Sequence, residues 1–107
     1  MDSLGRVLTA VSDPTRRAII DGLARGPARV TDVASPFSMS LNAVSKHVKV
    51  LEAAGLVRRA RRGREHLLEL NAVPLREILR WAHRYERFWN ERLDRLETFF
   101  GEKEKGQ

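Results

Sequence analysis

The chain has 107 residues, of which 42% are hydrophobic and 32% are charged. This length suits one domain, because domains cluster near ~100 to 150 residues, and it excludes a multidomain enzyme. The sequence contains no cysteine. Disulfide bonds, thiolate nucleophiles and metal sites built on cysteine are therefore excluded.

The charge balance is basic. Twenty lysine and arginine residues stand against 14 aspartate and glutamate residues, which gives a net charge of +6 at pH 7. The excess is concentrated in residues 56–70, where five arginines accompany two glutamates. A localised basic segment predicts a polyanionic partner such as a nucleic acid. No stretch has the apolar length of a signal peptide or a membrane span, so we expect a cytoplasmic protein.

Two helices are predicted at the N-terminus. Apolar residues recur at helical spacing up to Val11, and Ser12-Asp13-Pro14 then ends one helix and begins the next, with Asp13 as its N-cap. The second helix is expected to run to about Arg25 and to end at Gly26. The residues of this helix that should face a core are Ala18, Ile19 and Leu23.

A short third helix and a longer fourth helix follow. Thr31 is the expected N-cap of the third helix, which Pro36 must keep short or bent. Ser40 is placed to cap the fourth helix, about residues 41–54, and Gly55 ends it. The expected inward positions of the fourth helix step by three, four and three residues: Leu41, Val44, Val48 and Leu51.

From residue 56 the pattern changes to two short strand-like runs around Gly63, which predicts a β-hairpin over about residues 56–70. Pro74 then opens a helix over about residues 74–100, roughly 39 Å long. We expect residues 101–107 to form a flexible tail. The prediction is one domain over residues 1–100 that is mainly α-helical, with a small β-hairpin.

Three helices followed by a basic hairpin are the elements of a winged helix-turn-helix. The face of the fourth helix opposite its apolar positions carries short polar groups and cations, and no carboxylate precedes Glu52. Such side chains can reach base edges and phosphates in a major groove. The alternative is a helix face that is simply exposed to solvent. Such a face would be expected to carry glutamate as well as lysine. The DNA-binding residues predicted here are Ser40, Asn42, Ala43, Ser45, Lys46, His47 and Lys49.

The hairpin predicts a second contact with DNA. Arg61, Arg62 and Arg64 lie at its tip, and such a wing suits phosphates or the minor groove. Taken alone, an arginine run can equally be a solvated strand edge that is protected against pairing. Because the hairpin follows a helix suited to the major groove, we favour the interpretation that its arginines contact DNA. Arg16 and Arg17 are candidates for further phosphate contacts or for a solvated face.

Three segments carry a specific pattern: SDPTRRAIIDGLARG at 12–26, VTDVASPFSMSLNAVSKHVKVLEAAGLV at 30–57 and RRGRE at 61–65. Through them the chain resembles the ArsR-type (ArsR/SmtB) winged-helix transcriptional repressors over nearly its whole length. The resemblance implies a homodimeric, operator-binding repressor with Ser45, Lys46 and His47 on the recognition helix. It also implies that the first and last helices form the dimer interface.

The last helix supports a dimer independently, because it carries more apolar side chains than so small a domain can cover. A ligand pocket is the alternative, but aromatic residues at helical spacing are more often core or interface. Two-fold symmetry would place two recognition helices about 34 Å apart, which predicts a roughly palindromic operator. The predicted interface residues are Leu4, Val7, Leu8, Val11, Ile78, Ala82, Tyr85, Trp89 and Leu93.

No metal or cofactor is predicted. Many ArsR-type proteins sense metals through cysteines of the third helix or through histidines and carboxylates of the last helix, and this chain has neither set. Its histidines, His47, His66 and His83, fall on separate elements. His83 and Glu86 could supply two ligands from each subunit, but the neighbouring arginines would repel a cation.

No catalytic residue is predicted either. His47 and Ser45 are two residues apart on a helix and point in different directions, so a base and a nucleophile would not meet. We expect His47 to contact DNA, at a phosphate rather than a base. The sequence therefore predicts a homodimeric repressor that occludes a promoter, and not an enzyme. The alternative is a protein-interaction module that docks a partner through the aromatic C-terminal helix.

Overall fold

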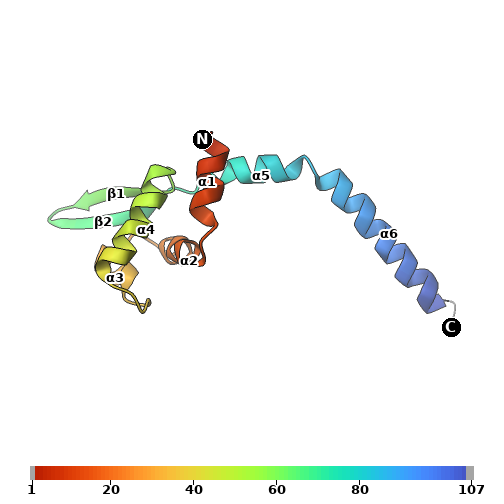
Figure 1. The fold of residues 1–107 in the computed structure, drawn as a ribbon, viewed down its shortest axis with the longest axis horizontal. Coiled ribbons are helices and arrows are strands. Elements are labelled where there is room, and N and C mark those ends of the chain that lie inside the picture. The colour runs from red at the N-terminus through yellow and green to blue at the C-terminus, as the bar shows by residue number, and fades with distance from the viewer. Residues whose placement is uncertain (1, 106–107) are drawn as a thin grey trace.

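The computed structural model describes residues 2–105, which form six helices and one antiparallel hairpin (Figure 1). In chain order, the elements are α1 (Ser3–Val11), α2 (Pro14–Leu23), α3 (Val30–Ala34), α4 (Leu41–Ala53), β1 (Val57–Arg62), β2 (Glu65–Leu70), α5 (Leu75–His83) and α6 (Glu86–Lys105). The predicted fold class, mainly α-helical with a small hairpin, is confirmed.

One apolar core joins α1, α2, α4 and the hairpin. Its largest fully buried side chains are Ile19, Leu51, Leu56, Leu68, Val7, Val44 and Val48. Two predicted inward positions are wrong, because Ala18 is exposed and Leu41 is 48% exposed. Leu41 is the first residue of α4, one turn before Val44, and the buried stripe of the helix begins only at Val44.

Side-chain caps fix where α2 and α4 begin. Oδ2 of Asp13 accepts a hydrogen bond from the backbone N–H of Arg16 at 3.0 Å, and Oγ of Ser40 accepts one from the N–H of Ala43 at 3.1 Å. Both predicted N-caps are confirmed. The bond from Arg16 holds the pKa of the Asp13 carboxyl below its ordinary value of 3.8, because it favours the charged form.

The start of α3 differs from the prediction. α3 begins at Val30 after an extended Arg29, and no side chain caps it. Thr31 is therefore a residue of the first turn and not the N-cap. The helix has only five residues and ends at Ala34, two residues before Pro36, so the proline limits the helix as expected.

The hairpin is anchored to the helical body by backbone hydrogen bonds. β1 pairs with β2 from Val57 and Leu70 at the base to Arg62 and Glu65 at the tip. Gly63 in the turn has a φ of 62°, a conformation that glycine adopts without steric cost. At the base, Leu68 and Ala28 exchange hydrogen bonds of 2.8 and 3.1 Å. β2 is thereby held between β1 and the segment that joins α2 to α3.

The predicted single helix over residues 74–100 is wrong. Two helices meet at Arg84 and Tyr85, whose N–H groups donate to carbonyls three residues back, at Trp81 (3.3 Å) and Ala82 (3.0 Å). This tightened turn ends α5. No proline or glycine marks the junction, so the helical spacing of the sequence continues through it.

The two helices also differ in their surroundings. α5 lies beside α1, where Oγ of Ser3 donates to Oε1 of Glu77 at 2.7 Å, whereas α6 extends away from the body (Figure 1). The radius of gyration is 19.6 Å, against about 13 Å for a single domain of this length.

α6 continues to Lys105, so residues 101–105 of the predicted flexible tail are helical, and residues 106–107 lie outside the described residues. No helix within residues 2–105 has the length and apolar character that crossing a membrane requires.

Replacement of Leu51 by alanine should lower the free energy of unfolding by about 2–5 kcal/mol, because Leu51 is 0% exposed and its truncation leaves a cavity. Leu41→Ala on the same helix is the matched control and should cost less than about 0.5 kcal/mol. Urea unfolding at one fixed protein concentration measures both, since oligomers unfold in a concentration-dependent way. Equal losses would contradict the assigned orientation of α4.

Replacement of Asp13 by asparagine should change how stability depends on pH. The folded-state pKa of Asp13 lies below 3.8, so its carboxylate stabilises the fold above that pH, and this contribution disappears as the pH falls through the folded-state pKa. Asp13→Asn keeps an oxygen that can cap α2 but does not titrate. The stability difference between wild type and variant, measured by urea unfolding, should shrink from about pH 6 to about pH 2. A constant difference would contradict this.

Candidate nucleic-acid interface

α4 presents a polar face to solvent because its apolar stripe lies in the core. The side chains on the stripe are Val44, Val48 and Leu51, each 0% exposed. The exposed residues opposite them include Asn42, Lys46 and Lys49, and Ala43, Ser45 and His47 are half-buried. The structure therefore brings the predicted residues of this helix onto one surface. Their contact with DNA stays a prediction.

His47 is held against the start of α2. Its Nδ1 lies 3.3 Å from Nη1 of Arg16 and 3.8 Å from Oδ2 of Asp13. An unprotonated Nδ1 can accept a hydrogen bond from Arg16, whereas a protonated Nδ1 is attracted to Asp13. In either state His47 joins the recognition helix to the N-terminus of α2. The sequence did not indicate this role, because the partners of His47 are distant along the chain.

Arg16 and Arg17 bind the end of α1. Nε and Nη2 of Arg16 donate to the carbonyls of Ala10 (2.7 Å) and Thr9 (2.9 Å), and Nη1 of Arg17 donates to the carbonyl of Val11 (2.7 Å). Carbonyls at the C-terminal end of a helix lack partners in the helix and carry partial negative charge, so they suit a guanidinium group. These bonds disfavour the phosphate contacts considered for the two arginines.

The wing is tied to the recognition helix by an ion pair between Arg59 of β1 and Glu52 of α4. Nη2 of Arg59 lies 2.9 Å from Oε1 of Glu52, and its Nε lies 3.2 Å from each carboxylate oxygen. The pair orients the wing more than it stabilises the fold, because exposed ion pairs contribute little free energy. It also offsets the negative charge at the end of the polar face, a function of Arg59 that the sequence did not indicate.

Several cations of α4 and the wing are free of strong internal partners. Lys46, Lys49 and Arg64 form no ion pair within the part of the chain that the structure describes. Arg61 donates to the carbonyl of Gly63 at 3.2 Å, and Nη2 of Arg62 lies 3.8 Å from the nearer oxygen of Glu69. Cations without a close carboxylate keep their charge available for a polyanion.

The residues predicted for a dimer interface fall into three groups. Leu8, Tyr85, Trp89 and Leu93 are exposed, and Leu4, Val11, Ile78 and Ala82 are half-buried. Val7 is only 1% exposed, because it packs in the protomer's own core. The prediction that Val7 contacts a partner subunit is therefore wrong, since its side chain reaches no surface.

His83 and Glu86, weighed above as possible metal ligands, bind each other across the α5–α6 junction. Nδ1 of His83 lies 2.8 Å from Oε2 of Glu86. Within residues 2–101, whose side chains the structure describes, no three histidine, aspartate or glutamate side chains gather in a way that could hold a metal ion. The pair acts as a local contact at the junction.

Residues 11–60, from the end of α1 into β1, match the family model described as a helix-turn-helix domain. The chain is 33% identical over 78 residues to the transcriptional repressor SdpR of Bacillus subtilis (strain 168), which covers 73% of this chain and 87% of that protein.

Among solved structures, the crystal structure of an ArsR family transcriptional regulator matches with a TM-score of 0.74 and 34% identity, covering 83% of this chain and 98% of that chain. The homodimeric winged helix-turn-helix DNA-binding domain of Mb0332 from Mycobacterium bovis, a possible ArsR-family transcriptional regulator, matches with a TM-score of 0.63 and 25% identity, covering 79% of this chain and 82% of that chain. The chain therefore belongs to the ArsR family of helix-turn-helix transcriptional regulators.

Proposed function

We propose that the protein is a homodimeric repressor that binds a roughly palindromic double-stranded operator and thereby occludes a promoter. The observation that carries this proposal is the face of α4 around Ser45, where polar groups and unpaired cations lie together and the carboxylate at its end, Glu52, is neutralised by Arg59. Membership of a family of transcriptional regulators supports it.

The recognition helix would lie in the major groove. α4 has 13 residues, a length of roughly 20 Å, and a major groove about 12 Å wide admits one helix. Asn42 and Ser45 carry groups that can hydrogen-bond base edges, and Lys46 and Lys49 can reach guanine or phosphates. His47 would contact a phosphate, in an orientation set by Arg16.

The wing would follow the phosphate backbone or the minor groove. Its tip carries Arg61, Arg62 and Arg64, and the ion pair between Arg59 and Glu52 sets the direction in which the hairpin leaves α4. Contacts of this kind add affinity without reading sequence, so the wing would fix the register of α4 on the duplex.

The dimer would form through α1, α5 and α6. The apolar residues from Tyr85 to Phe100 are each between 45% and 57% exposed, a larger apolar surface than monomeric proteins usually leave in water. Rings that follow one another along this surface contact each other, at 5.7 Å between the centroids of Trp81 and Tyr85 and 6.4 Å between those of Tyr85 and Trp89. The homodimeric state of the related Mycobacterium bovis domain supports this assembly.

The variant Lys46→Ala with Arg64→Ala should weaken DNA binding and flatten its salt dependence. Each lost phosphate contact reduces the magnitude of the slope of log K against log[salt] by about 0.9. The slope of the double variant should therefore be smaller in magnitude by roughly 1.8 than that of the wild type. The measurement is fluorescence anisotropy with a duplex that the wild-type protein selects from a random pool. The selected sequence should contain two inverted half-sites about 10 base pairs apart.

The control for this experiment is Arg76→Ala with Arg87→Ala, which removes the same charge from exposed positions on α5 and α6. It should leave the slope close to that of the wild type, because neither residue lies on α4 or the wing. Equal losses in the two double variants would mean that net charge alone drives binding and that α4 is wrongly assigned.

The variant Trp89→Glu with Leu93→Glu should produce monomers without unfolding the protomer, because both side chains are exposed in the single chain and charges in an apolar interface are costly. Sedimentation equilibrium measures the mass, and circular dichroism measures the helical content. Arg87→Glu on the polar side of α6 is the control and should remain dimeric. A dimeric mass for the double glutamate variant would refute the assigned interface.

A further inference from the structure

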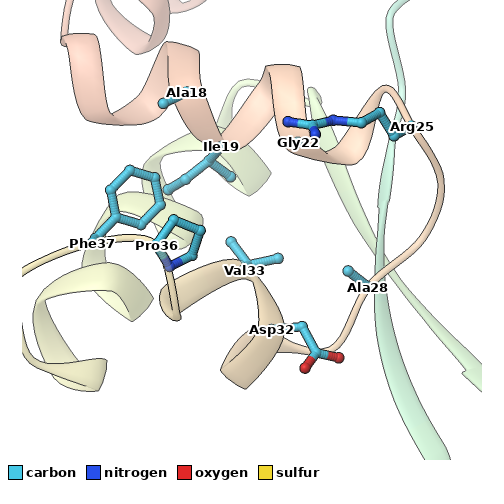
Figure 2. A pocket seen from close by; sticks show the side chains of 9 residues that line it. All are labelled: Ala18, Ile19, Gly22, Arg25, Ala28, Asp32, Val33, Pro36 and Phe37. Carbon is cyan, nitrogen blue, oxygen red and sulfur yellow. The ribbon is translucent and has the colours of Figure 1, made fainter.

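A pocket of about 410 Å³ lies between α2 and α3 (Figure 2). Its walls are mainly apolar, with Ile19 from α2, Val33 from α3, and Pro36 and Phe37 from the turn that leads into α4. Ligand pockets commonly have volumes of about 300 to 1,000 Å³ and combine apolar walls with a few polar groups. Neither the proposed DNA-binding face nor the proposed dimer interface uses this pocket.

Gly22 leaves one wall of the pocket open. It lies within α2, where glycine destabilises a helix by roughly 1 kcal/mol relative to alanine. A glycine at such a position usually avoids a clash, but a Cβ built on Gly22 would have no atom within 4 Å. The protein's own packing therefore does not require the missing side chain. Its absence does keep space free on the α2 wall of the pocket.

Arg25 supplies a positive charge at the rim. Its side chain runs back along α2 and lines the pocket at the same end as Gly22 (Figure 2). The backbone N–H of Arg25 donates to the carbonyl of Gly22 at 3.2 Å, but its guanidinium has no hydrogen bond or ion pair with any residue that the structure describes. Asp32 also lines the pocket, but its Oδ2 is bound to Nε of Arg29 at 3.0 Å and its carboxylate points away from the cavity. The unpaired group available to a ligand is thus a cation.

We infer that this pocket binds a small organic anion with an aromatic body and a single carboxylate. The ring would lie against Phe37, Pro36 and Val33, and the carboxylate would accept paired hydrogen bonds from Arg25. The pocket offers the single positive charge of Arg25, which favours a monoanion over a dianion such as a phosphate ester. Because α3 and the following turn form two of the walls, the ligand would contact the segment that positions the recognition helix.

The test is a titration of the full-length, ¹⁵N-labelled protein with 1-naphthoate, followed by NMR. We expect saturable shifts of the Gly22, Val33 and Phe37 amides. 1-Naphthamide, which has the same shape without the charge, should bind about tenfold more weakly, because hydrogen bonds to charged groups are the stronger ones. No saturable shift, equal binding of the two compounds, or shifts confined to the aromatic residues of α6 would overturn the proposal.

Two variants test the assigned groups. Arg25→Gln should bind 1-naphthoate about tenfold more weakly and 1-naphthamide as before, whereas Arg76→Gln on α5 should change neither. Gly22→Leu should fill the pocket and abolish both titrations while leaving the thermal midpoint at or above that of the wild type, because leucine favours a helix over glycine. If the leucine variant fails to fold, Gly22→Ala should still weaken the binding of both compounds. A naphthoate preference that survives Arg25→Gln, or binding that survives in the folded Gly22 variants, would refute the site.

Discussion

The burial of one side of α4 is the constraint on which the rest of the protein depends. Val44, Val48 and Leu51 are fully buried among α1, α2, α3 and the hairpin, so the helix cannot rotate without exposing its apolar stripe. The residues between them therefore face solvent in one fixed orientation. A rigid helix that presents short polar groups and cations is what reading a major groove requires.

Polar contacts refine the orientation that burial imposes. Arg16 binds the carbonyl end of α1 and approaches His47, so α1, α2 and α4 meet at one side chain. At the other end of α4, Glu52 holds Arg59 of the wing. Each contact is partly solvated and weak as a source of stability. Together they set the angle between the recognition helix and the hairpin, which a DNA-binding surface must keep constant.

Local rules predicted the elements that depend on neighbouring residues. The caps at Asp13 and Ser40, the end of α4 and the hairpin turn at Gly63 each rest on a side chain or a backbone conformation within a few positions. The errors about which positions are buried have a common cause, because burial depends on partners distant in sequence. Val7 and Leu41 have the same helical spacing as their neighbours, and only the packing of other elements decides that one is buried and the other exposed.

The sequence by itself determined the element order, the polar face of α4 and the arginine-rich wing, because periodicity and turn chemistry are written locally along the chain. The tertiary structure decided which cations form hydrogen bonds or ion pairs within the chain. It also decided that the C-terminal helix breaks at Arg84 and Tyr85 and that a pocket opens beside Gly22. These features arise where separate segments meet. The distances between residues on separate segments depend on how the core packs, and no single stretch of sequence determines that packing.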